Sequence, residues 1–278
     1  MPSSTRALTK PQGENILAEL HEDVYPAIDP KTTLKGCLKD HTVVIIGAGR
    51  GIGKEIGVAF AEAGCSTLVL CSRSVGQLNE TKDAILSSST SAPPTIIVQQ
   101  VDVTLNENFQ DLFALLEEKK LSVDVWVNNA GYMESIASIH EQNPETCTSS
   151  EASTKQLPGV SAYSGSKTAV NRLTEAVQAE YGDKGVRAFA VHPGAVPTEL
   201  ATTLPAQFHW MLVDKPLLMA GFCVYLVAKE NHTWLRPWQG AYMSSKWDVE
   251  HLKEMDVEAL AKDGRWGVEG WGKMRCTY

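Results

Sequence analysis

A tyrosine and a lysine lie four residues apart in the segment Tyr163-Ser164-Gly165-Ser166-Lys167. In a helix, residues at this spacing project from the same face, so the phenol and the ammonium group can lie side by side. A phenol has an ordinary pKa of about 10, too high for general acid–base catalysis at neutral pH, and a neighbouring ammonium group lowers it. The pair could therefore transfer a proton, although the same spacing also occurs by chance on helix surfaces.

A glycine-rich turn is the second feature that could do chemistry. It follows an apolar run that begins at residue 42, and it reads Gly47-Ala48-Gly49-Arg50-Gly51-Ile52-Gly53. Between a strand and a helix, backbone N–H groups and the helix dipole bind phosphate, and glycines let the phosphate approach closely. The turn therefore predicts a nucleotide site, with a merely structural turn as the alternative.

The spacing of the glycines bears on which nucleotide binds. A P-loop for ATP or GTP would need a glycine and a hydroxyl where the chain has Ala48 and Glu55. The G-x-G-x-x-G pattern also fails, because Ile52 stands in place of its third glycine. The pattern that fits is G-x-x-x-G-x-G, formed by Gly47, Gly51 and Gly53.

The residues after the second apolar run bear on the choice between NAD and NADP. An acid at this place would bind a free ribose 2′-hydroxyl, whereas a base would bind a 2′-phosphate. The chain has Ser72 and Arg73 there, and Arg50 in the glycine turn, but no carboxylate. We therefore expect NADP(H) rather than NAD(H), unless both arginines are only solvated surface residues.

Apolar periodicity predicts the elements that must position these residues. Short apolar runs predict strands at 42–49, 67–71, 95–101, 123–127, 187–192 and 240–244. Three-to-four spacing predicts helices at 52–63, 75–86, 106–119, 162–181 and 220–229. Such alternation is typical of a doubly wound α/β fold with a mostly parallel sheet. We expect an N-terminal extension at 1–40, a single Rossmann-like NADP-binding domain at 41–250 and a peripheral tail at 251–278.

Composition excludes several other classes of function. The chain has 278 residues, a net charge of −8 and a pI near 5.4, which disfavours a nucleic-acid-binding surface. Its six cysteines lack C-x-x-C spacing, so we expect no metal site and no disulfide framework. The sequence has no leader-like apolar segment and no apolar run of about 18 residues. These features predict a cytoplasmic protein that binds neither nucleic acid nor membrane.

Taken in order, the motifs resemble those of the short-chain dehydrogenase/reductase family, of the type long called classical. The resemblance rests on the glycine turn at 47–53, Asp102-Val103, Asn128-Asn129-Ala130-Gly131, Ser150, the segment at 163–167, and Pro193-Gly194 with Thr198. They occur in the family's order, and the resemblance covers roughly residues 40 to 250. The resemblance implies a Rossmann-like fold and hydride transfer between NADP(H) and an alcohol or ketone.

The resemblance also implies a role for each matching residue. Tyr163 would exchange the proton at the substrate oxygen, Lys167 would bind the nicotinamide ribose and lower the pKa of the tyrosine, and Ser150 would hydrogen-bond the carbonyl oxygen. Tyr163 and Lys167 would thus contact the cofactor as well as the substrate. The other expected cofactor-binding residues are Gly47, Arg50, Gly51, Ile52, Gly53, Ser72, Arg73, Asp102, Val103, Asn129, Ala130, Gly131, Pro193, Gly194, Val196 and Thr198.

The interval between Gly131 and Ser150 departs from the family pattern. Ser150 precedes Tyr163 by thirteen positions, as in the family, but follows Gly131 by only nineteen. A helix of about 18 residues, a strand of about 5 and their connections belong in this interval, so roughly 28 residues are absent. We expect one central strand and one long helix to be shortened or missing, together with the catalytic asparagine and the usual dimer surface of that helix. Residues 146–150 could still dock as a short fifth strand, or form a loop beside an open sheet.

Three interpretations remain open from the sequence. The first is an NADP(H)-dependent oxidoreductase that acts on a small apolar alcohol or ketone, such as a terpenoid or another secondary metabolite. The second is a dinucleotide-binding protein without turnover, and the third is a shortened variant of a competent enzyme. All three interpretations allow a homo-oligomer, but it would have to assemble without the usual interface helix. Residues that could line an apolar substrate pocket are Met133, Leu157, Phe208, Trp210 and Met211.

Overall fold

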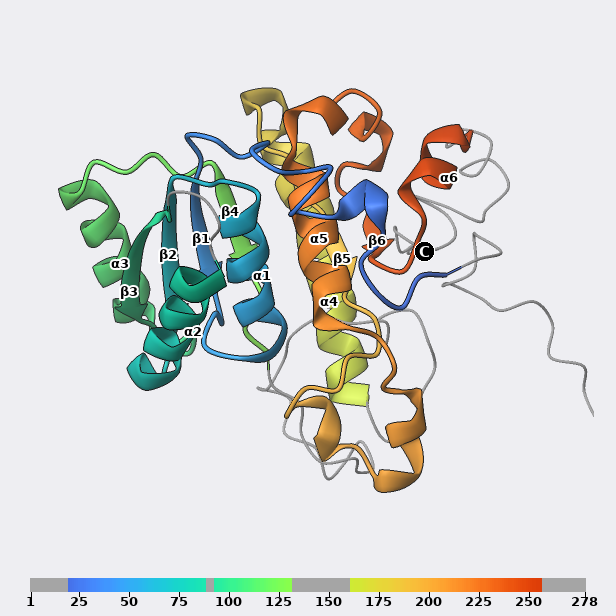
Figure 1. Ribbon diagram of the computed structural model, residues 1–278, viewed down its shortest axis with the longest axis horizontal. Helices are drawn as coiled ribbons and strands as arrows, with labels where there is room; N and C mark the ends of the chain where they lie inside the picture. Colours follow the sequence, from blue (N-terminus) through green and yellow to red (C-terminus); the bar gives the residue numbers. More distant parts are fainter. Residues whose placement is uncertain (1–19, 89–92, 132–160, 257–278) are drawn as a thin grey trace, which may run out of the picture.

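The computed structural model describes residues 20–88, 93–131 and 161–256 (Figure 1). Its larger sheet has four parallel strands in the order β3-β2-β1-β4. The strands are β1 (Thr42–Ile46), β2 (Thr67–Ser72), β3 (Thr95–Gln100) and β4 (Val125–Asn128). Because β2 and β3 lie on one side of β1 and β4 on the other, the order reverses at β1, as it does at the switch point of a doubly wound sheet.

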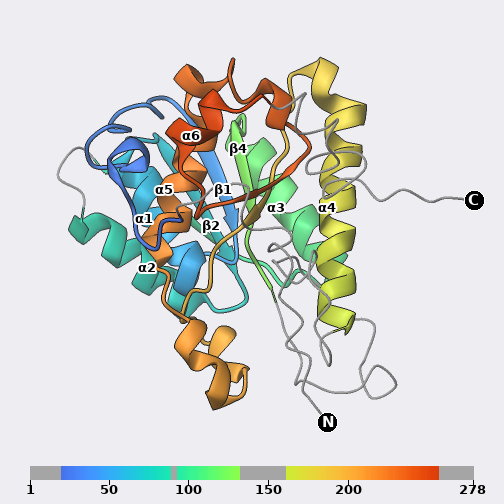
Figure 2. The same ribbon diagram turned by 90° about the vertical axis from the view of Figure 1, so that its right-hand side faces the viewer.

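Helices lie on both sides of this sheet. They are α1 (Gly51–Glu62), α2 (Val75–Ser88), α3 (Asn106–Glu118), α4 (Ser161–Tyr181) and α5 (Pro216–Val227). Figure 2 shows α1, α2 and α5 on one side of the strands, and α3 and α4 on the other. The predicted doubly wound α/β fold with a mostly parallel sheet is confirmed.

Alternate residues of the central strands pack against opposite layers of helices. Val43 and Ile45 of β1 belong to the core cluster that includes Phe60 of α1. Val44 and Ile46 belong instead to the cluster that includes Leu112 of α3. Because both faces are covered, β1 is apolar from residue 43 to residue 46, which is typical of parallel sheets.

A smaller sheet follows α4. In it β5 (Ala190–His192) pairs in parallel with β6 (Tyr242–Ser244), and α5 lies between them in sequence. In the described part of the chain, the strand pairs join β5 only to β6 and β4 only to β1. The segment that the sequence places between β4 and α4, 132–160, lies outside that part.

The two ends of the described chain pack against each other and against the core. Ile28, Leu34 and Leu38, which precede β1, are buried in the same cluster as α1. At the other end, α6 (Val249–Glu254) buries Val249 and Leu252. Apolar side chains at three-residue spacing thus bury one side of this short helix against the core.

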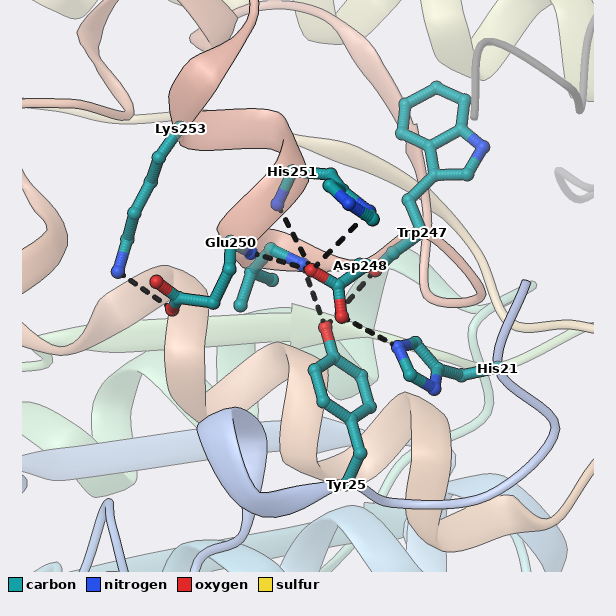
Figure 3. A network of polar contacts seen from close by, with 8 residues as sticks. His21, Tyr25, Trp247, Asp248, Glu250, His251 and Lys253 are labelled. Carbon is teal, nitrogen blue, oxygen red and sulfur yellow. Dashed lines mark hydrogen bonds and ion pairs between the residues drawn. The ribbon is translucent and has the colours of Figure 1, made fainter. Parts of the chain in front are cut away.

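Polar contacts join these two ends (Figure 3). His21 Nε2 lies 2.8 Å from Asp248 Oδ2, and the His21 ring stacks on Tyr25 with the centroids 3.6 Å apart. The Tyr25 hydroxyl donates to the Trp247 carbonyl (3.1 Å) and accepts from the Val249 N–H (2.9 Å). Asp248 also caps α6, by accepting the N–H groups of residues 250 and 251. A segment before β1 and a segment after β6 are thus fixed together.

Short 3-10 turns complete the described chain. They are η1 (Pro26–Ile28), η4 (Gly182–Lys184), η5 (Ala201–Thr203), η6 (Ala206–Met211), η7 (Lys229–Asn231) and η8 (Arg236–Trp238). Within the described residues, every helix is too short or too polar to cross a lipid bilayer.

Candidate active site

The candidate site lies at the carboxyl ends of β1, β2 and β4. Gly47 follows β1, Ser72 ends β2, and Asn129 follows β4. In Figures 1 and 2 these strand ends and the first turns of α4 point toward the same end of the molecule. In open α/β sheets, dinucleotides bind in the crevice at this end, where the strand order reverses.

The glycine turn is locked to the end of β4 by close backbone contacts. Asn129 Nδ2 donates to the Gly47 carbonyl at 3.0 Å. A Cβ added at Gly53 would overlap that carbonyl oxygen and would lie 2.5 Å from Asn129 Nδ2. A Cβ at Gly47, whose φ is +87°, would lie 2.6 Å from the Ala130 nitrogen. Glycine is therefore required at both positions, which explains two of the three glycines in the motif.

A buried threonine of α2 holds the same turn from the other side. Thr81 Oγ1 donates to the carbonyl of Ala48 (2.9 Å), with Gly49 O at 3.3 Å. Thr81 is fully buried. A Cβ at Gly49 would lie 2.9 Å from Ser72 Oγ, so the turn also lies against the end of β2. Ser72 is thereby placed beside the glycine turn, as the sequence predicts.

The loop after β5 reaches the glycine turn from the opposite side. A Cβ at Gly51 would lie 3.4 Å from Thr198 Cγ2. Arg50, which precedes the first residue of α1, forms an ion pair with Glu199 on the surface. Exposed ion pairs contribute little to stability, about 0–1 kcal/mol, so Arg50 can exchange its carboxylate partner for another anion.

The ends of β2 and β3 carry the residues predicted to meet the adenosine. Arg73 is exposed, and its carbonyl accepts a hydrogen bond from Gln100 Nε2 at 3.0 Å. Hydrogen bonds from the Thr104 N–H and hydroxyl hold the pKa of Asp102 below its ordinary value, and the Arg73 charge adds to the effect. Val103 is 48% exposed. Both residues lie at the same edge as Ser72, because β2 and β3 are parallel neighbours.

The tyrosine and the lysine share one face of α4. Lys167 Nζ lies 4.7 Å from the centroid of the Tyr163 ring, so the predicted proximity of the two groups is observed. The lysine is 4% exposed. Burial lowers the pKa of its ammonium group to about 7, because desolvation disfavours the charged form. Near neutral pH this group is therefore close to its own titration.

The turn after β5 is fixed by a buried carboxylate. Gly194 has a φ of +86°, and Val196 is buried. Asp214, which is fully buried, accepts the Ala195 N–H at 2.6 Å and is paired with Lys246. The Pro193-Gly194 turn thus has a defined conformation, and residues outside the predicted site set it.

A family model described as short chain dehydrogenase matches residues 41–148 and 146–208, more than half of the chain. The chain belongs to the short-chain dehydrogenase family. The family assignment made from the motifs is confirmed, and with it membership of a family of oxidoreductases that bind NAD or NADP.

Curated relatives support the assignment over most of the chain. Two fungal short chain dehydrogenases, mpl6 of Monascus purpureus and citE of Monascus ruber, are each 34% identical over 282 aligned residues. Each alignment covers 89% of this chain and 94% of the relative.

Solved structures share the fold at lower identity. One is a 3-oxoacyl-(acyl-carrier protein) reductase with bound NAD from Brucella melitensis, with a TM-score of 0.65 and 21% identity over 81% of this chain and 97% of that one. Another is YwfH, described as an NADPH dependent reductase involved in bacilysin biosynthesis, with a TM-score of 0.65 and 16% identity over 75% of this chain and 97% of that one. At these identities the likeness shows the fold of the family.

The structure of this short-chain dehydrogenase brings together part of the predicted site. The glycine turn, Ser72, Asn129, Ala130 and Thr198 make the close contacts described above. Gly131 is exposed after β4, and Ile52 is half-buried in the first turn of α1. Ser150 lies outside the described residues, as do Met133 and Leu157 of the expected substrate pocket.

Sequence reasoning missed three residues that support the site: Thr81, Asp214 and Lys246. Thr81 lies on a helix whose apolar pattern gives no reason to single out one hydroxyl. Asp214 and Lys246 are far apart in sequence, and only the fold shows that they form an ion pair. Neither residue carries a local sequence pattern that would single it out.

Proposed function

We propose that this short-chain dehydrogenase is an NADP(H)-dependent oxidoreductase that interconverts an alcohol and a ketone on a small apolar molecule. The observation that carries the proposal is the glycine turn. It is so close to Asn129 and Ala130 that side chains at Gly47 and Gly53 would clash, and it leads into the N-terminus of α1. Such a turn supports a bound pyrophosphate.

The charges at the end of β2 support NADP(H) over NAD(H). Arg50 and Arg73 are both exposed, and Ser72 stands where an NAD-specific chain would carry an acid. We propose that the two guanidinium groups bind the 2′-phosphate, for which arginine offers several donors in one plane. Arg50 would then give up Glu199, its present ion-pair partner.

In the proposed reaction each residue acts on a stated atom. When bound, NADPH supplies the hydride, and the protein supplies orientation and the proton. Tyr163 donates its phenolic proton to the substrate oxygen during reduction and accepts it during oxidation. Lys167 would stabilise the phenolate and would hold the nicotinamide ribose of the bound coenzyme. Ser150 hydrogen-bonds the substrate oxygen.

Exposed apolar side chains in the loop after Thr198 support a small apolar substrate. Phe208, Trp210 and Met211 lie on η6, in the loop that follows Thr198, and they are 38%, 75% and 44% exposed. Apolar side chains that line a pocket with few polar groups are typical of small-molecule sites. We propose a secondary metabolite such as a terpenoid as the substrate.

We further propose that this chain lacks a segment that other members of the family carry. The alignment with the two Monascus relatives runs over 282 positions, although it covers only 89% of the 278-residue chain, so the relatives have residues without a counterpart here. The two ranges matched by the family model meet at 146–148. This favours a single gap near that point. A chain so shortened could bind the dinucleotide without turnover, which is the second candidate function.

We also propose a domain organisation, a cellular compartment and partners for this chain. We propose that 41–250 form the NADP-binding domain, flanked by an extension at 1–40 and a tail at 251–278 whose inner parts pack on it.

Among the described cysteines, Cys37, Cys65, Cys71 and Cys223 are thiols. Free thiols suit a reducing compartment, so we propose the cytoplasm. Partners would be the small-molecule substrate and, in an oligomer, further copies of the chain.

Oxidation of NADPH in the presence of a panel of apolar ketones tests the proposed function. We expect ketone-dependent oxidation by the natural chain, and a loss of at least 100-fold in the Tyr163→Phe variant, because general acid–base catalysis contributes about 100- to 10,000-fold. Both proteins should bind NADPH. If both bind NADPH and neither oxidises it with any ketone, the binding protein without turnover is the correct interpretation.

A further inference from the structure

A buried ion pair lies behind the turn that follows β5. Lys246 Nζ lies 2.5 Å from Asp214 Oδ1, and the side chains are 12% and 0% exposed. The other carboxylate oxygen of Asp214 accepts the Ala195 N–H at 2.6 Å, and the Asp214 N–H donates to the Ala195 carbonyl at 3.2 Å. One aspartate therefore holds both backbone polar groups of Ala195.

The turn has little freedom to adopt another conformation around this pair. A Cβ added at Gly194 would lie 2.7 Å from Asp214 Oδ2, so the turn is packed directly on the carboxylate. The next residues of the loop lead to Thr198, which lies beside Gly51 of the glycine turn. A displacement at Ala195 would therefore be transmitted to the loop that borders the proposed coenzyme site.

The chain before β1 and the chain after β6 hold the ion pair in place. His21 N–H donates to the Lys246 carbonyl at 2.8 Å, and Lys215 N–H donates to the Glu22 carbonyl at 2.7 Å. Leu20 also forms an antiparallel bridge with Trp247. These contacts, with the network in Figure 3, fix the backbone next to both charged residues.

We propose that Asp214 and Lys246 are positioning residues that hold the loop 194–198 against the nicotinamide end of the coenzyme. The inference deepens the proposed function and rests on it. Neither residue needs to touch the coenzyme. The Asp214 carboxylate fixes Ala195, and its ion pair with Lys246 holds the carboxylate in position.

Loss of the ion pair should weaken binding of the nicotinamide end of the coenzyme and leave binding of the adenosine end unchanged. NADPH contains the nicotinamide, whereas 2′-phospho-ADP-ribose has the same adenosine and pyrophosphate without it. We expect Lys246→Met to weaken NADPH binding at least fivefold and to change the binding of 2′-phospho-ADP-ribose less than twofold. Lys246→Arg should restore NADPH binding to within twofold. Lys253→Met, which breaks the exposed pair with Glu250, is the matched control and should leave both affinities unchanged.

Fluorescence titration of the full chain with the two nucleotides measures these ratios. Asp214→Asn provides a second test of the ion pair. If Asp214→Asn does not fold, the comparison rests on Lys246→Met. Equal weakening of both nucleotides, or no change in either, overturns the positioning role while leaving the proposed function intact. If the natural chain binds neither nucleotide, the proposed function itself fails, and the inference fails with it.

Discussion

Single atomic contacts decide which residues of the site tolerate substitution. Gly53 and Gly57 both lie in α1, yet a Cβ at Gly53 would overlap the Gly47 carbonyl, whereas one at Gly57 would lie 3.4 Å from Ile85 Cδ1. The second distance is an ordinary van der Waals contact. Burial acts just as locally on Lys167, whose pKa it lowers to about 7. Gly53 and Lys167 thus owe their properties to the atoms that surround them.

The glycine contacts predict opposite effects for two alanine substitutions in the same helix. Gly53→Ala should lower the free energy of unfolding by about 1–3 kcal/mol, because the obstructing atom is backbone that cannot move aside. It should also abolish NADPH binding. Gly57→Ala should be neutral or stabilising by up to about 1 kcal/mol, since alanine is the better helix former. Urea unfolding and NADPH titration of both variants measure the contrast, and equal effects would contradict it.

The pKa of Lys167 predicts a pH dependence of stability. The folded-state pKa of about 7 lies below the unfolded value of 10.5, so between these values the unfolded chain binds a proton that the folded chain does not. The contribution of Lys167 to the free energy of unfolding is thus complete above pH 10.5 and is lost as the pH falls through 7. From pH 7 to 9 it should rise by up to about 1.4 kcal/mol per pH unit. Lys167→Met should lack this rise in urea unfolding, and parallel curves for the two proteins would rule the shift out.

At the scale of elements, segments distant in sequence hold one another in place. The chain before β1 packs on α1 and α5, where a Cβ at Gly221 would lie 2.5 Å from the Ile28 carbonyl. The same chain contacts Trp247 and α6 through Tyr25. The smaller sheet and the loop after β5 are therefore supported from both ends of the described chain.

Removal of one hydroxyl should loosen this support. Tyr25→Phe deletes the acceptor of the Val249 N–H and the donor to the Trp247 carbonyl, and buried groups left unsatisfied cost about 1–3 kcal/mol. We expect a loss of that size in the free energy of unfolding. Tyr181→Phe, at an exposed residue, should change it by less than about 0.5 kcal/mol. Thermal unfolding of the two variants distinguishes them, and the idea fails if both behave alike.

The elements near the glycine turn could be predicted from sequence, and those at the ends could not. The run at 43–46 in β1 is continuously apolar, and the helix after it has apolar residues at three-to-four spacing, so the sequence predicts both elements. The predicted strand at 187–192 is observed as Ala190–His192, because only its last residues pair with β6. The buried part of the first 40 residues was missed because prolines and polar residues obscure its few apolar positions. Contacts such as Asp214 with Lys246 depend on long-range packing, which no local pattern encodes.

At the scale of the whole molecule, the described strands form two sheets. In the described residues β4 pairs with β1 alone and β5 with β6 alone, and an unpaired strand edge leaves backbone groups without partners from the sheet. We propose that the missing family segment would have supplied the strand between them. We propose that the elements from β1 to β4 suffice to bind the coenzyme, so binding and turnover can be tested separately in this chain.

Inserting the family segment should raise both the melting temperature and the activity of the chain. We expect a chimera that carries the corresponding segment of the Monascus purpureus relative between Gly131 and Ser150 to melt at least about 4 °C higher, because each kcal/mol shifts the melting temperature by about 2–4 °C at this size. Ketone-dependent NADPH oxidation should rise with it. A glycine-serine insert of the same length is the control. Equal melting temperatures for the two inserts would show that the chain lacks nothing the family segment supplies.

A crystal structure of the full chain with NADP⁺ would show whether the glycine turn and α4 bind the two ends of one coenzyme. We expect the pyrophosphate on the backbone amides of Gly51 to Gly53, the 2′-phosphate between Arg50 and Arg73, and the nicotinamide ribose within hydrogen-bond distance of Lys167 Nζ. Tyr163 should then face the nicotinamide ring. A coenzyme bound away from the glycine turn, or one whose nicotinamide lies on the side of the sheet opposite α4, would contradict it.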